Sequence, residues 1–237
     1  MAQPPEAALD RLRAGDVELI ERMPWSSNAT FLASVNADDD ETLVIYKPAR
    51  GERPLWDFEP GTLCRREMAA FEVSEALGWS IVPPTVIREG PYGPGMVQLF
   101  IDHDPDDHFL ELRDRFADRF AQVAAFDIVI NNADRKSGHC ILDRHGVVWG
   151  IDHGVSFHVE HKLRTVIWDY AEDPLPPEVT EGLDRLEAAF ADGLEQRLAA
   201  LLSVDEACVT RARARALADA GRFPLPRGDY PYPWPLV

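Results

Sequence analysis

The first hundred residues contain several short apolar runs bounded by turn residues, a pattern typical of β-strands. Residues 17–47 predict two strands joined by the acidic turn 36–41, and Pro48 ends the second strand because proline cannot donate to a ladder. Two more strands are expected over residues 85–88 and 96–101, on either side of a turn rich in glycine and proline. The pattern therefore predicts a strand-rich first part of the chain.

Helical periodicity takes over in the second part. One helix already interrupts the strands at residues 64–77, and Gly78 ends it. Between Phe109 and Val123, apolar residues recur at steps of three and four, as on the buried face of a helix. Two further helices are predicted over residues 186–201 and 205–220.

A short hairpin separates the predicted helices, with residues 139–142 and 147–151 as its strands and residue 142 opposite residue 147. Because strands come first and helices follow, the sequence predicts an α+β fold with two lobes. The small, sheet-rich N-lobe would span residues 15–101 and the helical C-lobe residues 102–237, with a hinge between them.

Charge narrows the classes of partner. The chain of 237 residues carries 24 basic and 41 acidic side chains, a formal net charge of −17. Such a surface repels nucleic-acid phosphates and anionic lipid headgroups, so nucleic-acid binding is not expected and membrane association is disfavoured. No apolar run approaches the roughly 18 residues of a membrane span, and the N-terminus lacks the apolar stretch of a signal peptide.

The three cysteines are widely spaced and form no C-x-x-C pair. Their odd number argues against a disulfide framework, and their spacing argues against a zinc site. Buried free thiols in a reducing compartment fit better, so a cytoplasmic location is expected.

A lysine and a glutamate of the N-lobe form the first part of a candidate nucleotide site. Lys47 ends the strand 44–47, as the ATP-binding lysine of protein kinases does. Glu67 lies three residues before Ala70 on the apolar stripe of the helix 64–77, so its carboxylate turns inward. A buried carboxylate needs a cation, which Lys47 can supply. A surface lysine and a solvated first-turn glutamate are the alternative.

The second part is the segment 132–139, Asn-Ala-Asp-Arg-Lys-Ser-Gly-His. Kinase catalytic loops place an aspartate five residues before a metal-binding asparagine. Here Asp134 stands five residues before His139, a metal-capable residue of a different type. Asp134 would accept or orient the proton of an attacking hydroxyl. A simple turn at the end of a helix is the alternative, because Asn and Asp favour such turns.

The third part is Asp152 in the sequence Ile151-Asp152-His153-Gly154, which has the D-x-G form of the kinase metal-binding aspartate. In the predicted hairpin, His139 and Asp152 emerge at the same end, where they could hold Mg²⁺ carried by ATP. A D-x-G segment alone is a weak signal. Lysine, helix glutamate, D-x-x-x-x-H and D-x-G in this order are together a strong one.

With these residues in view, the chain resembles the phosphatidylinositol 3- and 4-kinase superfamily, nearest to type II lipid 4-kinases and bacterial persistence-toxin kinases and to an actinobacterial branch. Asp134-Arg135 keeps the D-R order of that family's catalytic loop, and Lys47-Pro48 looks like its K-P. The resemblance spans about residues 25–158 and implies a kinase-like fold that uses ATP with Mg²⁺ or Mn²⁺. His139 departs from the usual asparagine, and the phosphate-covering loop lacks G-x-G-x-x-G.

The resemblance assigns roles to named residues. Adenine would lie between the lobes, Arg135 or Lys136 would offset charge at the γ-phosphate, and His139 with Asp152 would bind the metal. The candidate cofactor-binding residues are Ser27, Asn28, Ile45, Lys47, Glu67, Gln98, Leu99, Phe100, Ile101 and Ile151. The Pro-rich tail, residues 224–235, is expected to fold back on the surface.

These features predict an ATP-dependent phosphotransferase for a soluble acceptor, either a protein hydroxyl or a small polyol. Activity with Mn²⁺ should match or exceed that with Mg²⁺, because imidazole suits later metals. Lipid-kinase activity is not carried over, since the chain has no basic amphipathic helix. The alternatives are a nucleotide-binding pseudokinase or scaffold, an AMP-transferring enzyme on the same fold, and a phosphoinositide kinase.

Overall fold

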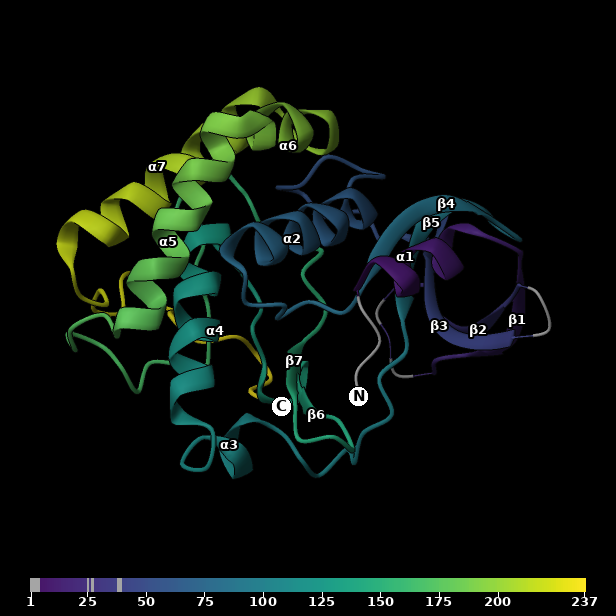
Figure 1. The fold of residues 1–237 in the computed structure, drawn as a ribbon, viewed down its shortest axis with the longest axis horizontal. Helices are drawn as coiled ribbons and strands as arrows, with labels where there is room; N and C mark the ends of the chain where they lie inside the picture. Colours follow the sequence, from purple (N-terminus) through teal and green to yellow (C-terminus); the bar gives the residue numbers. More distant parts are fainter. Residues whose placement is uncertain (1–4, 25, 27, 38–39) are drawn as a thin grey trace.

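A five-stranded antiparallel sheet builds one side of the molecule and a group of helices builds the other (Figure 1). The computed structural model describes residues 5–24, 26, 28–37 and 40–237. The strands lie in the order β1-β2-β3-β5-β4. Their bounds are Asp16–Arg22 (β1), Phe31–Ala37 (β2), Asp40–Pro48 (β3), Thr85–Gly90 (β4) and Gly93–Leu99 (β5). The predicted α+β class, with strands first and helices after, is confirmed.

The first 48 residues contain more regular structure than the sequence predicted. Residues 17–47 were predicted to form two strands, but they belong to three, because β1 is a separate strand at the edge of the sheet. Val17 is the only buried residue of β1, and the rest of the strand is exposed or partly exposed. A short helix, α1 (Pro5–Arg13), was also missed; its Leu12 packs into the apolar cluster of the sheet with Val44 and Val97.

Helix α2 (Leu63–Leu77) lies between the sheet and the C-terminal helices, as Figure 1 shows. Its predicted extent is correct to within one residue. Gly78 adopts a φ of 69°, and this left-handed conformation ends the helix as predicted. The face that carries Ala70, Val73 and Leu77 is fully buried, so α2 joins the core of the C-terminal half to the sheet.

The C-terminal helices surround a continuous apolar core. They are α3 (Phe109–Leu112), α4 (Ala117–Ile130), α5 (Pro177–Ala189), the π-helical turn η3 (Phe190–Leu194), α6 (Glu195–Leu201) and α7 (Val204–Ala220). The single helix predicted over 109–123 is wrong, because the chain leaves the helix after Leu112 and α4 begins at Ala117. Phe109 and Phe120 nevertheless face the same core and stack edge to face at 5.0 Å. Two short helices that share one core can therefore show the apolar spacing of a single longer helix.

The hairpin is present, with β6 (Cys140–Leu142) and β7 (Val148–Gly150), but its register differs by one residue from the prediction. Leu142 pairs with Val148, and Asp143 N donates to Val147 O at 2.9 Å. The turn therefore has three residues, and Gly146 with a φ of 81° closes it. Two 3₁₀ turns, η1 (Ala49–Gly51) and η2 (Ser137–His139), complete the regular structure.

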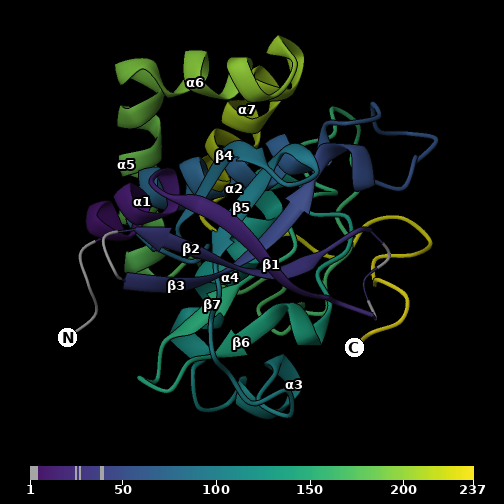
Figure 2. The ribbon, with the colours of Figure 1, turned by 90° about the vertical axis from the view of Figure 1, so that its right-hand side faces the viewer.

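The Pro-rich tail folds back on the helical half, as predicted (yellow in Figure 2). Thr165 N donates to Pro231 O at 3.1 Å, and Ser137 N donates to Leu236 O at 2.8 Å. All three cysteines are free, but Cys208 is exposed, so the expectation of buried thiols holds only for the other two. In the described part of the chain, no helix is both long and apolar enough to span a bilayer.

Candidate active site

Lys47 lies at the centre of the site, at the end of β3. Its Nζ donates to Glu67 Oε1 at 2.6 Å and to Asp152 Oδ1 at 2.8 Å. The sheet and the helical half therefore contribute groups of opposite charge to one point. Burial alone lowers the pKa of Lys47, but the carboxylates of Asp152 and Glu67 outweigh it and raise that pKa above its usual value. The ammonium group stays charged throughout the neutral range.

Glu67 faces inward from α2, as its position on the apolar stripe predicted. Its side chain is 2% exposed, and its second oxygen, Oε2, accepts from the backbone N–H of His153 at 2.8 Å. Burial raises the pKa of Glu67, while Lys47 and the His153 amide oppose that shift. Glu67 thus fixes the position of Lys47 and also anchors the residue after Asp152.

Asp152 follows β7 with a φ of 61°, in the left-handed region that few residues other than glycine, asparagine and aspartate adopt. Its carboxylate is half exposed in the cleft. Lys47 is the main reason that the pKa of Asp152 falls well below its ordinary value. A strained backbone that places a charged carboxylate beside a lysine is typical of functional sites.

His139 lies next to Asp152, with its Nε2 3.5 Å from Asp152 Oδ2. Although the hairpin register was predicted one residue out, Ile151 N donates to His139 O at 2.9 Å, so the two side chains still emerge together. Burial lowers the pKa of His139 to about 4, which keeps the imidazole neutral at pH 7 and able to bind a metal. Within the described residues no group of three or more His, Cys, Asp or Glu could hold an ion, so this pair would need ligands from the substrate.

Asp134 lines the same cleft from the loop after α4. Its backbone N–H donates to Asn132 Oδ1 at 3.0 Å, and its Oδ2 lies 3.3 Å from Lys136 Nζ. Burial raises the pKa of Asp134 above its ordinary value, and Lys136 opposes the shift. The side chain is one-third exposed, so it can meet a substrate.

Arg135 is not available to a substrate, which corrects the expectation that it offsets charge at the γ-phosphate. Its side chain is fully buried and forms a two-pronged ion pair with Asp127 of α4, with Nη2 to Oδ1 at 3.0 Å and Nε to Oδ2 at 3.1 Å. It also donates to the carbonyls of His139 and Ile151 and to His153 Nε2. Arg135 thereby ties the loop of Asp134 to the loop of Asp152. The sequence analysis missed its partner, Asp127.

Two adjoining cavities meet at Lys47 and Asp152. The larger, about 250 Å³, is mostly apolar and is also lined by His139 and by the predicted residues Ile45, Gln98, Leu99, Phe100, Ile101 and Ile151. The smaller, about 70 Å³, contains Glu67, Asp134 and Asn28. An apolar slot beside a charged pocket suits a molecule with an aromatic ring at one end and phosphates at the other.

Several predicted ligand residues have limited freedom to bind a nucleotide. The Gln98 side chain is buried and donates to Thr85 Oγ1 at 2.9 Å, so its amide is already engaged within the sheet. Asn28 Oδ1 already accepts from Arg53 N at 2.8 Å. Ser27 lies outside the described residues.

Comparison with known proteins gives the family. The sequence profile of phosphatidylinositol 3- and 4-kinase matches residues 87–211. Protein Rv2133c of Mycobacterium tuberculosis is 39% identical over 259 aligned positions, which cover 94% of this chain and 93% of the relative. The chain belongs to the phosphatidylinositol 3- and 4-kinase family. The predicted resemblance, including its actinobacterial branch, is confirmed.

Solved structures share the fold of this phosphatidylinositol 3- and 4-kinase family member. Hydra Fam20, solved with sugar, superposes with a TM-score of 0.59 at 16% identity, over 90% of this chain and 86% of that one. The proinflammatory kinase CtkA of Helicobacter pylori gives a TM-score of 0.56 at 10% identity, over 88% of this chain and 93% of that one. The fold is therefore kinase-like, as predicted.

Proposed function

We propose that the protein transfers the γ-phosphoryl group of ATP to a hydroxyl of a soluble acceptor. The observation that carries this proposal is the position of Lys47, whose Nζ contacts both Glu67 and Asp152 where an apolar cavity meets a charged one. Membership of a kinase family agrees with it. Adenine would occupy the apolar cavity beside Ile45 and Ile151, and the phosphates would extend toward Lys47.

Lys47 can take a phosphate without losing its anchor. An ammonium group has three N–H donors, and Glu67 and Asp152 occupy two of them. The third donor is free for a phosphate oxygen, and the contact with Asp152 can be exchanged for another while Glu67 keeps the side chain in place. Positioning of this kind is the main contribution that a protein makes to phosphoryl transfer.

His139 and Asp152 are the residues that would hold a divalent cation with the phosphates. A neutral imidazole nitrogen 3.5 Å from a charged carboxylate oxygen, both facing the nucleotide cavity, fits Mg²⁺ or Mn²⁺ as two of its ligands. Bound there, the ion would neutralise charge on the phosphate oxygens.

Asp134 would act on the acceptor. As the acceptor oxygen forms its bond to the γ-phosphorus, the O–H proton passes to the Asp134 carboxylate and the bond to the departing ADP oxygen breaks. Burial favours this role, because it raises the pKa of Asp134 and makes the carboxylate a better proton acceptor. Lys136, 3.3 Å from Asp134, keeps the carboxylate charged beforehand and can also face the transferred group.

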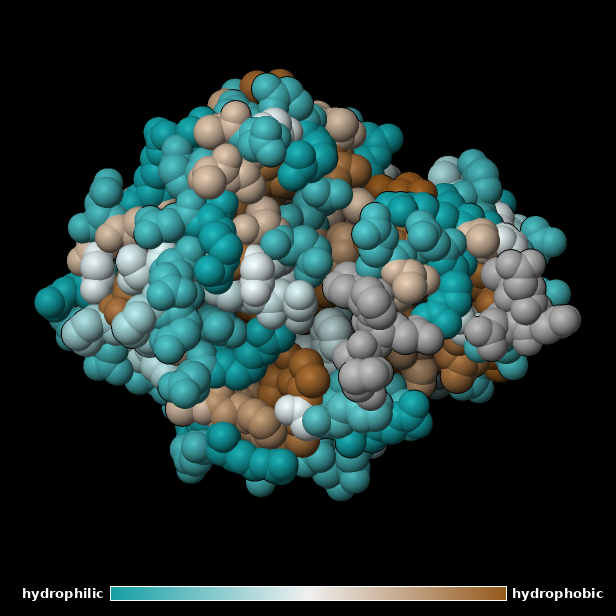
Figure 3. All heavy atoms as spheres, in the orientation of Figure 1, coloured by the Kyte–Doolittle hydropathy of each residue, from teal (hydrophilic) through white to brown (hydrophobic). Residues whose placement is uncertain are grey.

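Charge and one structural neighbour support the acceptor class that we propose. The net charge of −17 opposes an anionic bilayer, and mainly hydrophilic residues cover the face shown in Figure 3. Hydra Fam20, with the same fold, was solved with sugar. We therefore favour a small polyol as acceptor, with a protein hydroxyl second.

Incubation with Mn²⁺-ATP and a metabolite extract tests the proposal. We expect newly phosphorylated small molecules by mass spectrometry, and none with Lys47→Met. A rise in melting temperature with ATP but no transferred group would instead identify a pseudokinase. An added AMP group in place of a phosphoryl group would identify an AMP-transferring enzyme.

The histidine at the metal position gives a separate prediction. We expect activity with Mn²⁺ to equal or exceed activity with Mg²⁺, and we expect His139→Asn to shift the preference toward Mg²⁺, because an amide oxygen suits the harder ion. Initial rates over a range of each metal concentration measure this. A strict Mg²⁺ requirement that His139→Ala leaves unaltered would rule out a ligand role for His139.

A further inference from the structure

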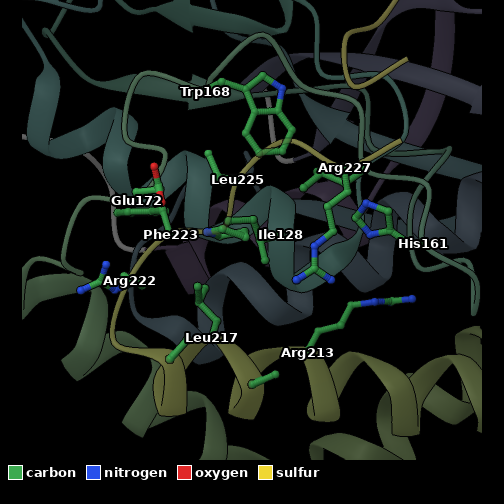
Figure 4. Close-up of a pocket in the computed structure, with 14 residues that line it drawn as sticks. Ile128, His161, Trp168, Glu172, Arg213, Leu217, Arg222, Phe223, Leu225 and Arg227 are labelled. Carbon is green, nitrogen blue, oxygen red and sulfur yellow. The ribbon is translucent and has the colours of Figure 1, made fainter. Parts of the chain in front are cut away.

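A separate cavity, about 500 Å³, lies in the helical half and shares no lining residue with the two cavities of the candidate nucleotide site. Its walls come from α4, the segment 161–172, α7 and the first part of the Pro-rich tail, as Figure 4 shows. The volume lies within the usual range for small-molecule sites. The proposed kinase activity makes no use of it.

The lining of this cavity combines apolar and basic side chains. Its larger apolar residues are Ile128, Leu163, Trp168, Leu217, Phe223 and Leu225. Three arginines and one glutamate complete the charged lining. The chain as a whole has 24 basic and 41 acidic residues, so the cavity reverses the overall balance. A positive cavity in a protein of charge −17 is a specific feature that the average composition does not produce.

Two of these arginines gather with His161 at one end of the cavity (Figure 4). Arg213 of α7 donates through Nη2 to the carbonyls of His158 and Val159, which fixes its guanidinium there. Its Nη1 is buried and has no hydrogen-bond partner among the described residues. Arg227 makes no hydrogen bond or ion pair with the part of the chain that the structure describes. The end of the cavity therefore holds positive charge that lacks a counter-ion.

The titration behaviour of these groups agrees with the geometry. Burial lowers the pKa of Arg213 to about 10, and Glu206, the carboxylate that acts on it, is already paired with Arg66 at 2.7 Å. Burial and the charges of Arg227 and Arg213 lower the pKa of His161. Arg213, whose Nη1 is buried without a hydrogen-bond partner among the described residues, would gain most from an anion, because a desolvated charge needs a partner.

We propose that this cavity binds a small amphiphilic anion: an apolar ring or chain rests on Trp168 and Leu217, and a phosphate, sulfonate or carboxylate group lies between Arg213 and Arg227. Arginine suits such groups because its planar fork donates two parallel hydrogen bonds. The apolar lining makes a bare inorganic anion a poorer ligand, because burial of an apolar part supplies affinity that inorganic phosphate lacks.

A matched pair of fluorescent probes tests the site. 1-Anilinonaphthalene-8-sulfonate carries the anionic group, and N-phenyl-1-naphthylamine has the same aromatic body without it. We expect the sulfonate probe to bind one site per chain, and Arg227→Ala to weaken that binding about tenfold, the effect of one charge-assisted hydrogen bond. Arg227→Glu should abolish it, and both variants should leave the neutral probe unchanged. Arg227 is exposed, so neither change should affect folding.

Two further variants locate the binding. Ala216→Trp should fill the cavity from α7 and remove binding of both probes, while Arg144→Ala, in the distant β6–β7 turn, should change nothing. Probe titrations are repeated with a saturating non-hydrolysable ATP analogue. The analogue displaces any probe bound in the nucleotide cleft and leaves the probe bound in the separate cavity. Sulfonate binding that survives Arg227→Glu and Ala216→Trp, or that the ATP analogue fully displaces, would overturn the proposal.

Discussion

Replacing Asp152 with asparagine should lower ATP-dependent phosphate transfer about a thousandfold. The site loses the carboxylate that contacts Lys47, and His139 loses the charged residue with which it would hold the metal. The fold should survive. Asparagine tolerates the φ of 61° at this position, and Lys47 keeps its bond to Glu67. Steady-state rates, with melting temperature measured in parallel, check both parts.

Asp184→Asn is the matched control for this variant, since Asp184 is exposed on α5, and this helix lines neither cavity of the candidate site. It should retain the activity of the unmodified protein. Transfer by Asp152→Asn at more than about a tenth of that activity would contradict the assignment of the site.

The largest expected effect on stability concerns the buried pair of Asp127 and Arg135. Both side chains are fully buried, and Asp127 also accepts from Asn132 Nδ2 at 3.0 Å and from Thr165 Oγ1 at 3.2 Å. Asp127→Ala leaves the guanidinium of Arg135 buried without its counter-ion. We expect the free energy of unfolding to fall by about 3–5 kcal/mol in denaturant titrations.

Two controls separate burial from charge. The exposed pair of Arg113 and Asp169, 3.2 Å apart, should contribute less than about 1 kcal/mol, so Asp169→Ala should change stability little. The double variant Asp127→Leu with Arg135→Met removes both charges together and should unfold at higher denaturant than Asp127→Ala. A double variant no more stable than the single one would show that the buried charge is not the cause.

The sequence predicted the parts of the site that depend on local pattern. Lys47 closes a short apolar strand that Pro48 ends, and Glu67 lies on a helix whose apolar stripe fixes its direction, so both could be placed without coordinates. Asp152 and His139 could be brought together from the hairpin even with the register one residue out. The register was predicted one residue out because the length of the turn depends on Gly146, whose positive φ allows a turn of three residues where four were predicted.

The role of Arg135 could not be predicted in the same way. A motif gives the residue type at a position but not whether the side chain faces a ligand or the core. One signal was available: Asp127 is the only charged residue between positions 120 and 130, in an otherwise largely apolar helix. A charge on a buried helix face requires a partner, and Arg135 is the nearest cation beyond the helix end. The edge strand β1 gave no comparable signal, because it carries a single buried residue, Val17.

The return of the Pro-rich tail has a consequence for the order in which the protein matures. The Asp134–His139 loop bonds to a residue more than ninety positions later, because Ser137 N donates to Leu236 O at 2.8 Å. The ribosome must therefore have added Leu236 before this loop has its full set of hydrogen bonds. A nascent chain that already contains Lys47, Glu67 and Asp152 would still lack that support, so the candidate site should reach its final order only after synthesis has passed Leu236.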